Sequence, residues 1–187
     1  MTDPVQTVLD CARDLPFDEA LAVADSALRS GLVERRSLVE AAARSPRTGR
    51  SRVLRVVHAA DGRAANPFES ALRAIALDVP GLAVEPQVTL GLAEADGVVV
   101  VLGRADLVDA SLGLVVEAES WEFHGDRGAF DRDVRRYTSM VRAGWRVVRF
   151  VWADVMHDPD HVRAVLTDVV ALATGAVADH VVSAEAG

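Results

Sequence analysis

Two short apolar stretches decide the fold of this chain: Gly103-Arg104-Ala105-Asp106-Leu107-Val108 and Leu114-Val115-Val116-Glu117-Ala118-Glu119. Both are rich in branched aliphatic residues and a short turn separates them, which predicts two adjacent β-strands. Alternate residues of a strand share one face of the sheet, so Glu117 and Glu119 are expected to point the same way, and Asp106 can join them from the neighbouring strand. Three such carboxylates repel one another unless a hard cation neutralises them, and oxygen ligands of this kind suit Mg²⁺ or Mn²⁺. The two stretches therefore predict a metal site at an edge of the sheet.

The simpler explanation of these acids is that they are solvated caps at the ends of strands. The elements around them favour a metal site, because strands and helices follow one another in a defined order. The apolar spacing predicts a helical segment first, then one more helix, three strands, a helix, a strand and a last helix. The predicted fold class is α/β, a mixed sheet flanked by helices behind an N-terminal helical segment.

Turn residues and helix caps place the boundaries of these elements. Pro16 and Gly31 end the first two helices, and Ser37 is the expected N-cap of a third over 38–44. Further helices are expected over 48–60, from Pro67 to Pro80, over 128–142, and over 154–174 with a break near Asp158-Pro159; strands are expected over 84–90, 98–109 with a bulge at Gly103, 113–119 and 145–152. We expect a helical segment at 1–62, a second domain at 63–175 and a flexible tail at 176–187.

Composition narrows the classes of protein that the chain can be. Half of the 187 residues are hydrophobic, and no apolar run is long enough to span a bilayer, so we expect a cytoplasmic protein without a membrane partner. Cys11 is the only cysteine, which excludes an intramolecular disulfide and a cysteine-based zinc site. All 20 basic residues are arginine, so no mechanism here can use lysine.

The charge of the chain is unevenly distributed along the sequence. The net charge of −8 argues against a protein that coats nucleic acid through its overall charge. Residues 44–63 nevertheless carry six arginines against one acid, and residues 121–150 carry seven against four, whereas residues 64–120 carry nine acids against two arginines. Basic flanks around an acidic centre suit a metal-dependent enzyme that acts on a phosphate backbone; solvated helix faces would give the same pattern.

Five segments, in this order, resemble bacterial domains related to very-short-patch-repair endonucleases, which have the PD-(D/E)xK nuclease fold. They are Phe68-Glu69-Ser70, GRADLV (103–108), VVEAESWEFHG (115–125), FDRDVRRY (130–137) and GWRVVRFVW (144–152), and the resemblance covers residues 66–170. Residues 2–31 also resemble the middle of actinobacterial AbiEi-like antitoxin family proteins that carry this nuclease-like domain at the C-terminus. A winged helix-turn-helix precedes this point in those proteins, so we expect a shortened member that lacks the DNA-recognition module.

The resemblance implies a set of catalytic residues. Asp106 and Glu117 would be the metal-binding pair, with Glu69 reaching the metal directly or through water; as a first-turn acid, Glu69 also suits the helix dipole. Glu119 stands where nuclease relatives have lysine and where this subfamily more often has aspartate. His124 matches an active-site histidine and would accept a proton from the attacking water.

Three further residues are candidates for binding phosphate. Gln87 on the first strand would orient water or phosphate. Arg135 and Arg136 on the helix that follows the third strand would hold a phosphate by bidentate hydrogen bonds, although surface pairing along that helix explains them as well.

The sequence is compatible with two functions. The leading one is a metal-dependent endonuclease-like domain that hydrolyses DNA phosphodiester bonds by metal-activated water. The alternative is a non-catalytic DNA-binding or toxin–antitoxin-type regulatory module on a nuclease scaffold, in which the arginine-rich helix at 48–60 contacts DNA or a partner protein. A homodimer formed through the helical segment is compatible with either function.

Overall fold

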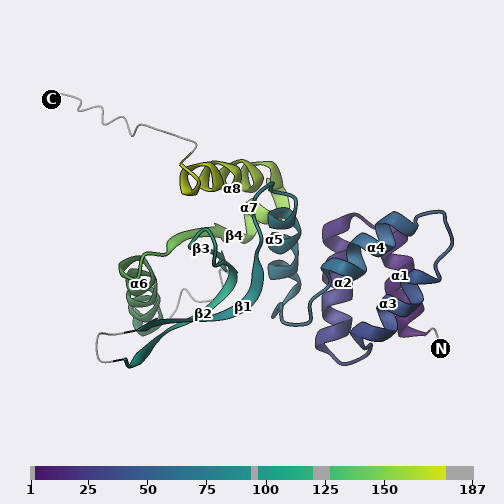
Figure 1. Cartoon of the computed structure of the whole chain (residues 1–187), viewed down its shortest axis with the longest axis horizontal. Coiled ribbons are helices and arrows are strands. Elements are labelled where there is room, and N and C mark those ends of the chain that lie inside the picture. The colour runs from purple at the N-terminus through teal and green to yellow at the C-terminus, as the bar shows by residue number, and fades with distance from the viewer. Residues whose placement is uncertain (1–2, 94–96, 120–126, 176–187) are drawn as a thin grey trace.

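The structure is a computed structural model, and it describes residues 3–93, 97–119 and 127–175. The N-terminal segment is a bundle formed by α1 (Pro4–Asp14), α2 (Phe17–Arg29), α3 (Arg35–Ala43) and α4 (Arg50–Ala59) (Figure 1). Its core is filled by fully buried aliphatic side chains, among them Leu21, Leu38, Val53 and Val57. The apolar stripes that predict these helices are thus the faces that pack together.

The expected N-cap of α3 is wrong. The helix begins at Arg35, with extended backbone at Glu34, and Ser37 lies inside its first turn. Arg35 and Arg36 are good helix formers, so the helix starts before the serine that would have capped it. Ser37 therefore makes no contribution as a cap.

The helix α5 (Pro67–Leu77) lies between the bundle and the sheet (Figure 1). Leu72 and Ile75 belong to the core of the sheet, whereas Ala74 is packed in the core of the bundle. Arg73 of α5 donates hydrogen bonds to both carboxylate oxygens of Asp25 on α2, at 2.8 and 2.7 Å, and both side chains are buried. The helix α5 therefore contributes side chains to both hydrophobic cores, and the buried ion pair connects it to α2 of the bundle.

Four strands form one mixed sheet in the order β1-β2-β3-β4, with bounds Glu85–Ala93, Val99–Asp109, Leu114–Glu119 and Arg146–Val151. The first three strands form an antiparallel meander, and β4 runs parallel to β3 after the crossover helix α6 (Arg127–Arg142). The helices α7 (Trp152–His157) and α8 (Pro159–Ala173) follow, separated by the expected break at Asp158-Pro159. The predicted fold class, a mixed sheet flanked by helices behind an N-terminal helical segment, is confirmed.

The two faces of the sheet are covered differently. Leu107, Leu114 and Val116 pack with α5 and α8, whereas Val108 and Val115 pack on the opposite face with Met140 of α6 (Figure 1). The expected irregularity at Gly103 is present: Leu90 pairs with Gly103 and Gly91 with Val101, so β2 has one extra residue there. Gly103 has φ +139, a backbone angle that favours glycine.

Within the described ranges, no helix is both long and apolar enough to cross a membrane. The predicted tail at 176–187 lies outside these ranges.

Candidate functional site

Gln87 on β1 connects two of the predicted acidic residues. Its Nε2 donates hydrogen bonds to Glu69 Oε2 at 2.8 Å and to Asp106 Oδ1 at 3.1 Å. Gln87 has φ +56, the only positive φ of a non-glycine residue in the described part of the chain. Such a backbone angle is costly for glutamine and is held only where the surroundings impose it, so it marks a candidate functional position.

The sheet register brings Asp106 and Glu117 together. Leu107 pairs with Val116, so Asp106 and Glu117 occupy the next position of each strand, on the face toward α6. The backbone N–H of Ala118 donates to Asp106 Oδ2 at 2.9 Å, and this bond fixes the Asp106 carboxylate beside β3. Glu117 is buried, with 2% of its surface exposed.

Burial and a neighbouring charge disfavour ionisation of Glu117. Burial comes first and the Asp106 carboxylate second, and together they raise the pKa of Glu117 to about 8, although Arg136 opposes the shift. Glu117 Oε1 is buried without a hydrogen-bond donor among the described residues. A buried carboxylate oxygen without a partner is unfavourable, and either a proton or a cation bound to it would compensate the cost.

Glu69 lies where a first-turn acid is expected, whereas its role as a metal ligand stays a prediction. It lies in the first turn of α5, where its Oε2 accepts a hydrogen bond from the Ala65 N–H at 2.8 Å and its Oε1 accepts one from Asn66 Nδ2 at 2.9 Å. Burial and the charge of Asp106 raise the pKa of Glu69. The side chain thus closes the start of the helix and also joins the acidic cluster through Gln87.

Arg136 on α6 is the cationic neighbour of this cluster. Its Nη2 lies 3.1 Å from Glu117 Oε2, and its Nη1 donates to the backbone oxygen of Arg104 at 2.7 Å. Of the two arginines predicted to bind phosphate, Arg136 reaches the site. Arg135 is exposed and does not line the hollow described below, so its role stays a prediction.

Glu119 points to the same side as Glu117, as the strand period predicts, but it has different partners. Its Oε1 accepts a hydrogen bond from the Tyr137 hydroxyl at 2.5 Å and lies 2.7 Å from Arg149 Nη2. Burial and the hydrogen bond to Glu119 raise the pKa of Tyr137. Glu119 Oε1 therefore has both an arginine and a tyrosine hydroxyl as partners, whereas Glu117 Oε1 has no hydrogen-bond partner among the described residues.

Tyr137 and Arg149 are site residues that the sequence analysis missed. The signal for Arg149 was the alternation of β4, in which Val147 packs on the α6 side and Arg149 follows two residues later on the same side. Both residues border a hollow of about 340 Å³ between the sheet and α6. Its lining is Asp106, Glu117, Ala118, Glu119, Phe130, Asp133, Val134, Arg136, Tyr137 and Arg149.

Among the described residues, no group of three or more His, Cys, Asp or Glu side chains is gathered around one point that could hold a metal ion. Instead, the amide of Gln87 separates Glu69 from Asp106, and Arg136 occupies one side of Glu117. His124 lies outside the described residues.

No protein-family model matches the chain, and no solved structure matches it either. Among curated proteins it is similar to "Uncharacterized protein MT2308" of Mycobacterium tuberculosis strain CDC 1551 / Oshkosh and to "Uncharacterized protein Rv2248" of strain ATCC 25618 / H37Rv. Each is 31% identical over 164 residues, which cover 87% of this chain and 59% of the relative. The chain thus spans less than two thirds of the length of these relatives.

Proposed function

We propose that the sheet and its flanking helices form a metal-dependent DNA endonuclease-like domain that hydrolyses phosphodiester bonds. The observation that carries the proposal is the pair of the half-buried Asp106 and the buried Glu117, which Gln87 connects to Glu69. Clustered carboxylates in a buried environment are unfavourable on their own. They are common in sites that bind a cation or transfer protons.

The donor atoms of this cluster are of the type that a hard divalent cation binds. Asp106, Glu117 and Glu69 supply carboxylate oxygens and Gln87 supplies an amide oxygen, and two of these oxygens, Glu117 Oε1 and Gln87 Oε1, are buried without a hydrogen-bond partner among the described residues. Oxygen donors of this type suit Mg²⁺ or Mn²⁺. When bound, such an ion neutralises the carboxylates and lowers the pKa of a coordinated water.

The remaining side chains suit a phosphodiester substrate. Arg136 and Arg149 border the hollow and could donate hydrogen bonds to phosphate oxygens. Gln87 positions Glu69 and Asp106 through its amide. The proton acceptor assigned to His124 rests on the resemblance to patch-repair endonucleases alone.

The order of elements supports the same proposal. The helix α5, the meander β1–β3, the crossover helix α6 and the parallel strand β4 follow in the order of the nuclease-like domains that the sequence resembles. Asp106 lies on the second strand and Glu117 on the third, as that resemblance implies. Since a fold does not determine a function, the acidic cluster carries more weight than the topology.

One observation favours the second function, a non-catalytic DNA-binding or regulatory module. Arg136 already forms an ion pair with Glu117, and Arg149 does the same with Glu119. In this alternative the arginines stabilise the acidic residues permanently and no metal is required. DNA or a partner protein would then bind elsewhere, and a homodimer would be compatible with either function.

Nicking of supercoiled plasmid DNA in Mg²⁺ or Mn²⁺ tests the proposal. We expect the wild-type chain and Asp131→Asn to nick and Asp106→Asn to fail, because Asp131 is exposed on α6 and does not line the hollow. Calorimetric titration with Mn²⁺ should show uptake that Glu117→Ala abolishes. Equal nicking by all three proteins, or no nicking and no metal uptake by the wild type, would contradict the endonuclease and leave the non-catalytic module.

A further inference from the structure

A group of arginines that the candidate site does not use lies on the helical bundle. It covers residues 44–55, a range without any acidic residue, and consists of Arg44, Arg47, Arg50, Arg52 and Arg55. Within the described part of the chain, Arg55 is the one member of the group that pairs with a carboxylate, that of Asp78. We call these five residues the α4 arginine surface.

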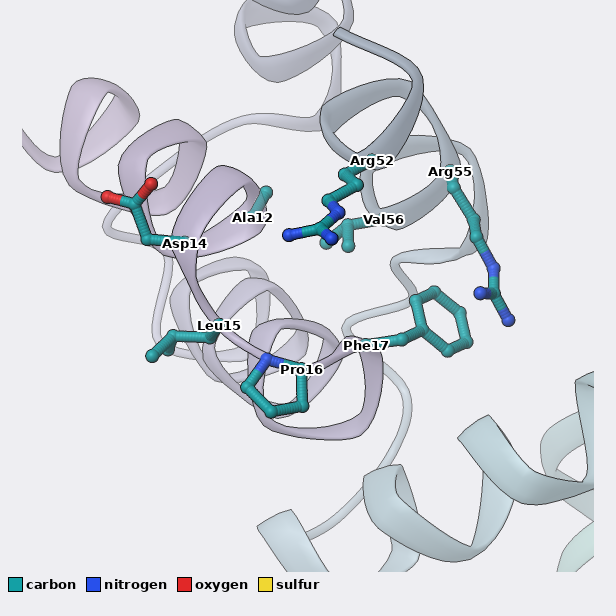
Figure 2. Close-up of a pocket in the computed structure, with 8 residues that line it drawn as sticks. All are labelled: Ala12, Asp14, Leu15, Pro16, Phe17, Arg52, Arg55 and Val56. Atoms are coloured by element: carbon teal, nitrogen blue, oxygen red, sulfur yellow. The ribbon is translucent and has the colours of Figure 1, made fainter. Parts of the chain in front are cut away.

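Two members of this surface border a hollow of about 390 Å³. Figure 2 shows Arg52 and Arg55 extending from α4 over the junction between α1 and α2, where Leu15, Pro16 and Phe17 line the floor. The Arg55 guanidinium lies over the Phe17 ring, 3.6 Å from its centre. Arg52 makes one long hydrogen bond, to the Arg13 backbone oxygen at 3.5 Å, so most of its donors are free of protein acceptors in the described ranges.

Close packing at Gly49 brings a further arginine to this surface. Gly49 has φ +74, and a Cβ atom at this position would lie 2.6 Å from Arg13 Cγ. The start of α4 therefore lies directly against the Arg13 side chain, which is paired with Asp10. Because Asp10 compensates the charge of Arg13, the excess positive charge belongs to the arginines of α4 and of the turn before it.

This concentration of charge is unfavourable unless an anion compensates it. The chain as a whole has a net charge of −8, yet four arginines within nine residues, 44 to 52, have no carboxylate partner in the described structure. Like charges at this spacing repel one another, and free guanidinium groups are well suited to bind phosphate. The surface therefore suits an anionic partner that presents several phosphates.

We infer that the α4 arginine surface binds the phosphate backbone of nucleic acid, away from the acidic cluster. The inference rests on the proposed function in one respect, because DNA is the polyanion that the candidate site would take as its substrate. Contacts of this kind carry no sequence preference; they add affinity and hold the duplex near the protein. The apolar floor beside Arg52 leaves room for a sugar or base next to a bound phosphate.

The test measures binding of a short fluorescein-labelled duplex by fluorescence anisotropy, in EDTA and over a range of salt concentrations. The test variant is Arg47→Gln/Arg52→Gln, and the control is Arg36→Gln/Arg163→Gln, which removes an exposed and a half-buried arginine that pair with Glu40 and Asp160. Both variants change the net charge equally. Each lost phosphate contact should reduce the slope of log K against log salt by about 0.9, so the test variant should lose about 2 and the control nothing.

Equal binding by the test variant and the wild type would overturn the inference, and so would an equal loss in the control or a wild type that does not bind duplex. Stronger competition by poly-L-glutamate than by unlabelled duplex at the same charge concentration would overturn it as well, because it would indicate an acidic protein partner. Plasmid nicking by the same proteins separates the two proposals. Nicking with an unchanged salt slope removes only the arginine surface, whereas arginine-dependent binding without nicking removes only the endonuclease.

Discussion

Replacing Glu117 by glutamine should make the metal-free protein more stable at neutral pH. Glutamine keeps the shape of the side chain, can donate a hydrogen bond to Asp106, and removes a carboxyl group whose ionisation is disfavoured by burial and by Asp106. Its oxygen can still accept from Arg136, which lies 3.1 Å from Glu117 Oε2. We therefore expect a gain of stability at a residue proposed to be essential for metal binding.

The size of the gain follows from the pKa of Glu117, which rises from an ordinary 4.5 to about 8 on folding. Below pH 4.5 the carboxyl of Glu117 is protonated in both the folded and the unfolded state, so it does not lower the free energy of unfolding. Above this pH the unfolded chain releases the proton first, so the free energy of unfolding of the wild type falls as the pH rises through this window. Each unit corresponds to about 1.4 kcal/mol, which gives roughly 3 kcal/mol at neutral pH and about 5 kcal/mol in alkali.

Urea unfolding in EDTA, followed by circular dichroism across this pH window, measures the effect. Glu117→Gln should lose the part of the pH dependence that Glu117 contributes, whereas Glu119→Gln should show no gain, because Glu119 is already stabilised by Tyr137 and Arg149. The reasoning is refuted if Glu117→Gln is no more stable than the wild type near pH 8, or if its advantage is the same at every pH.

Two further predictions concern the bundle. Asp25→Ala should lower the free energy of unfolding by about 3–5 kcal/mol in urea titrations, because it leaves the Arg73 charge buried without its partner; replacing both residues by apolar ones should recover much of this loss, and a small effect of the single change would contradict a buried ion pair. Gly49→Ala should lower the melting temperature more than Gly31→Ala, because both glycines have positive φ but only at Gly49 does the new methyl group meet a side chain, that of Arg13; equal losses would show that the contact does not matter.

Periodicity explains why much of the sheet could be predicted. A strand repeats every two residues, so Glu117 and Glu119 had to share a face, and the glycine at 103 had to mark the irregular position of β2. The break before α8 also follows from local chemistry, since Pro159 at the start of a helix fits the Asp158 cap. These features depend on neighbours in the chain, which a single sequence displays.

The partners of the acidic residues depend on register and on distance along the chain, and they could not be predicted. Asp25 and Arg73 are 48 residues apart, and nothing in their local sequence indicates the pair. Glu119 meets Arg149 because β4 runs parallel to β3 in a register set by the whole core. One residue along α6 decides that Arg136 reaches Glu117 while Arg135 stays exposed, and this rotation depends on how the helix packs.

The features that local rules do not explain converge on one place. Gln87 has a backbone angle that glutamine avoids, Glu117 is a buried acid with an unpaired oxygen, and its partner Arg136 has a buried Nε without an acceptor among the described residues. Each costs stability, and folded domains have only about 5–15 kcal/mol in total. In a well-determined fold such costs are expected at a ligand-binding site, because the ligand can compensate them in the bound state.

A cation between Asp106 and Glu117 that also bound Glu117 Oε2 would displace Arg136 from this oxygen, and the released guanidinium would then face the same hollow as a phosphate donor. Metal binding and phosphate binding would therefore be coupled through this one side chain.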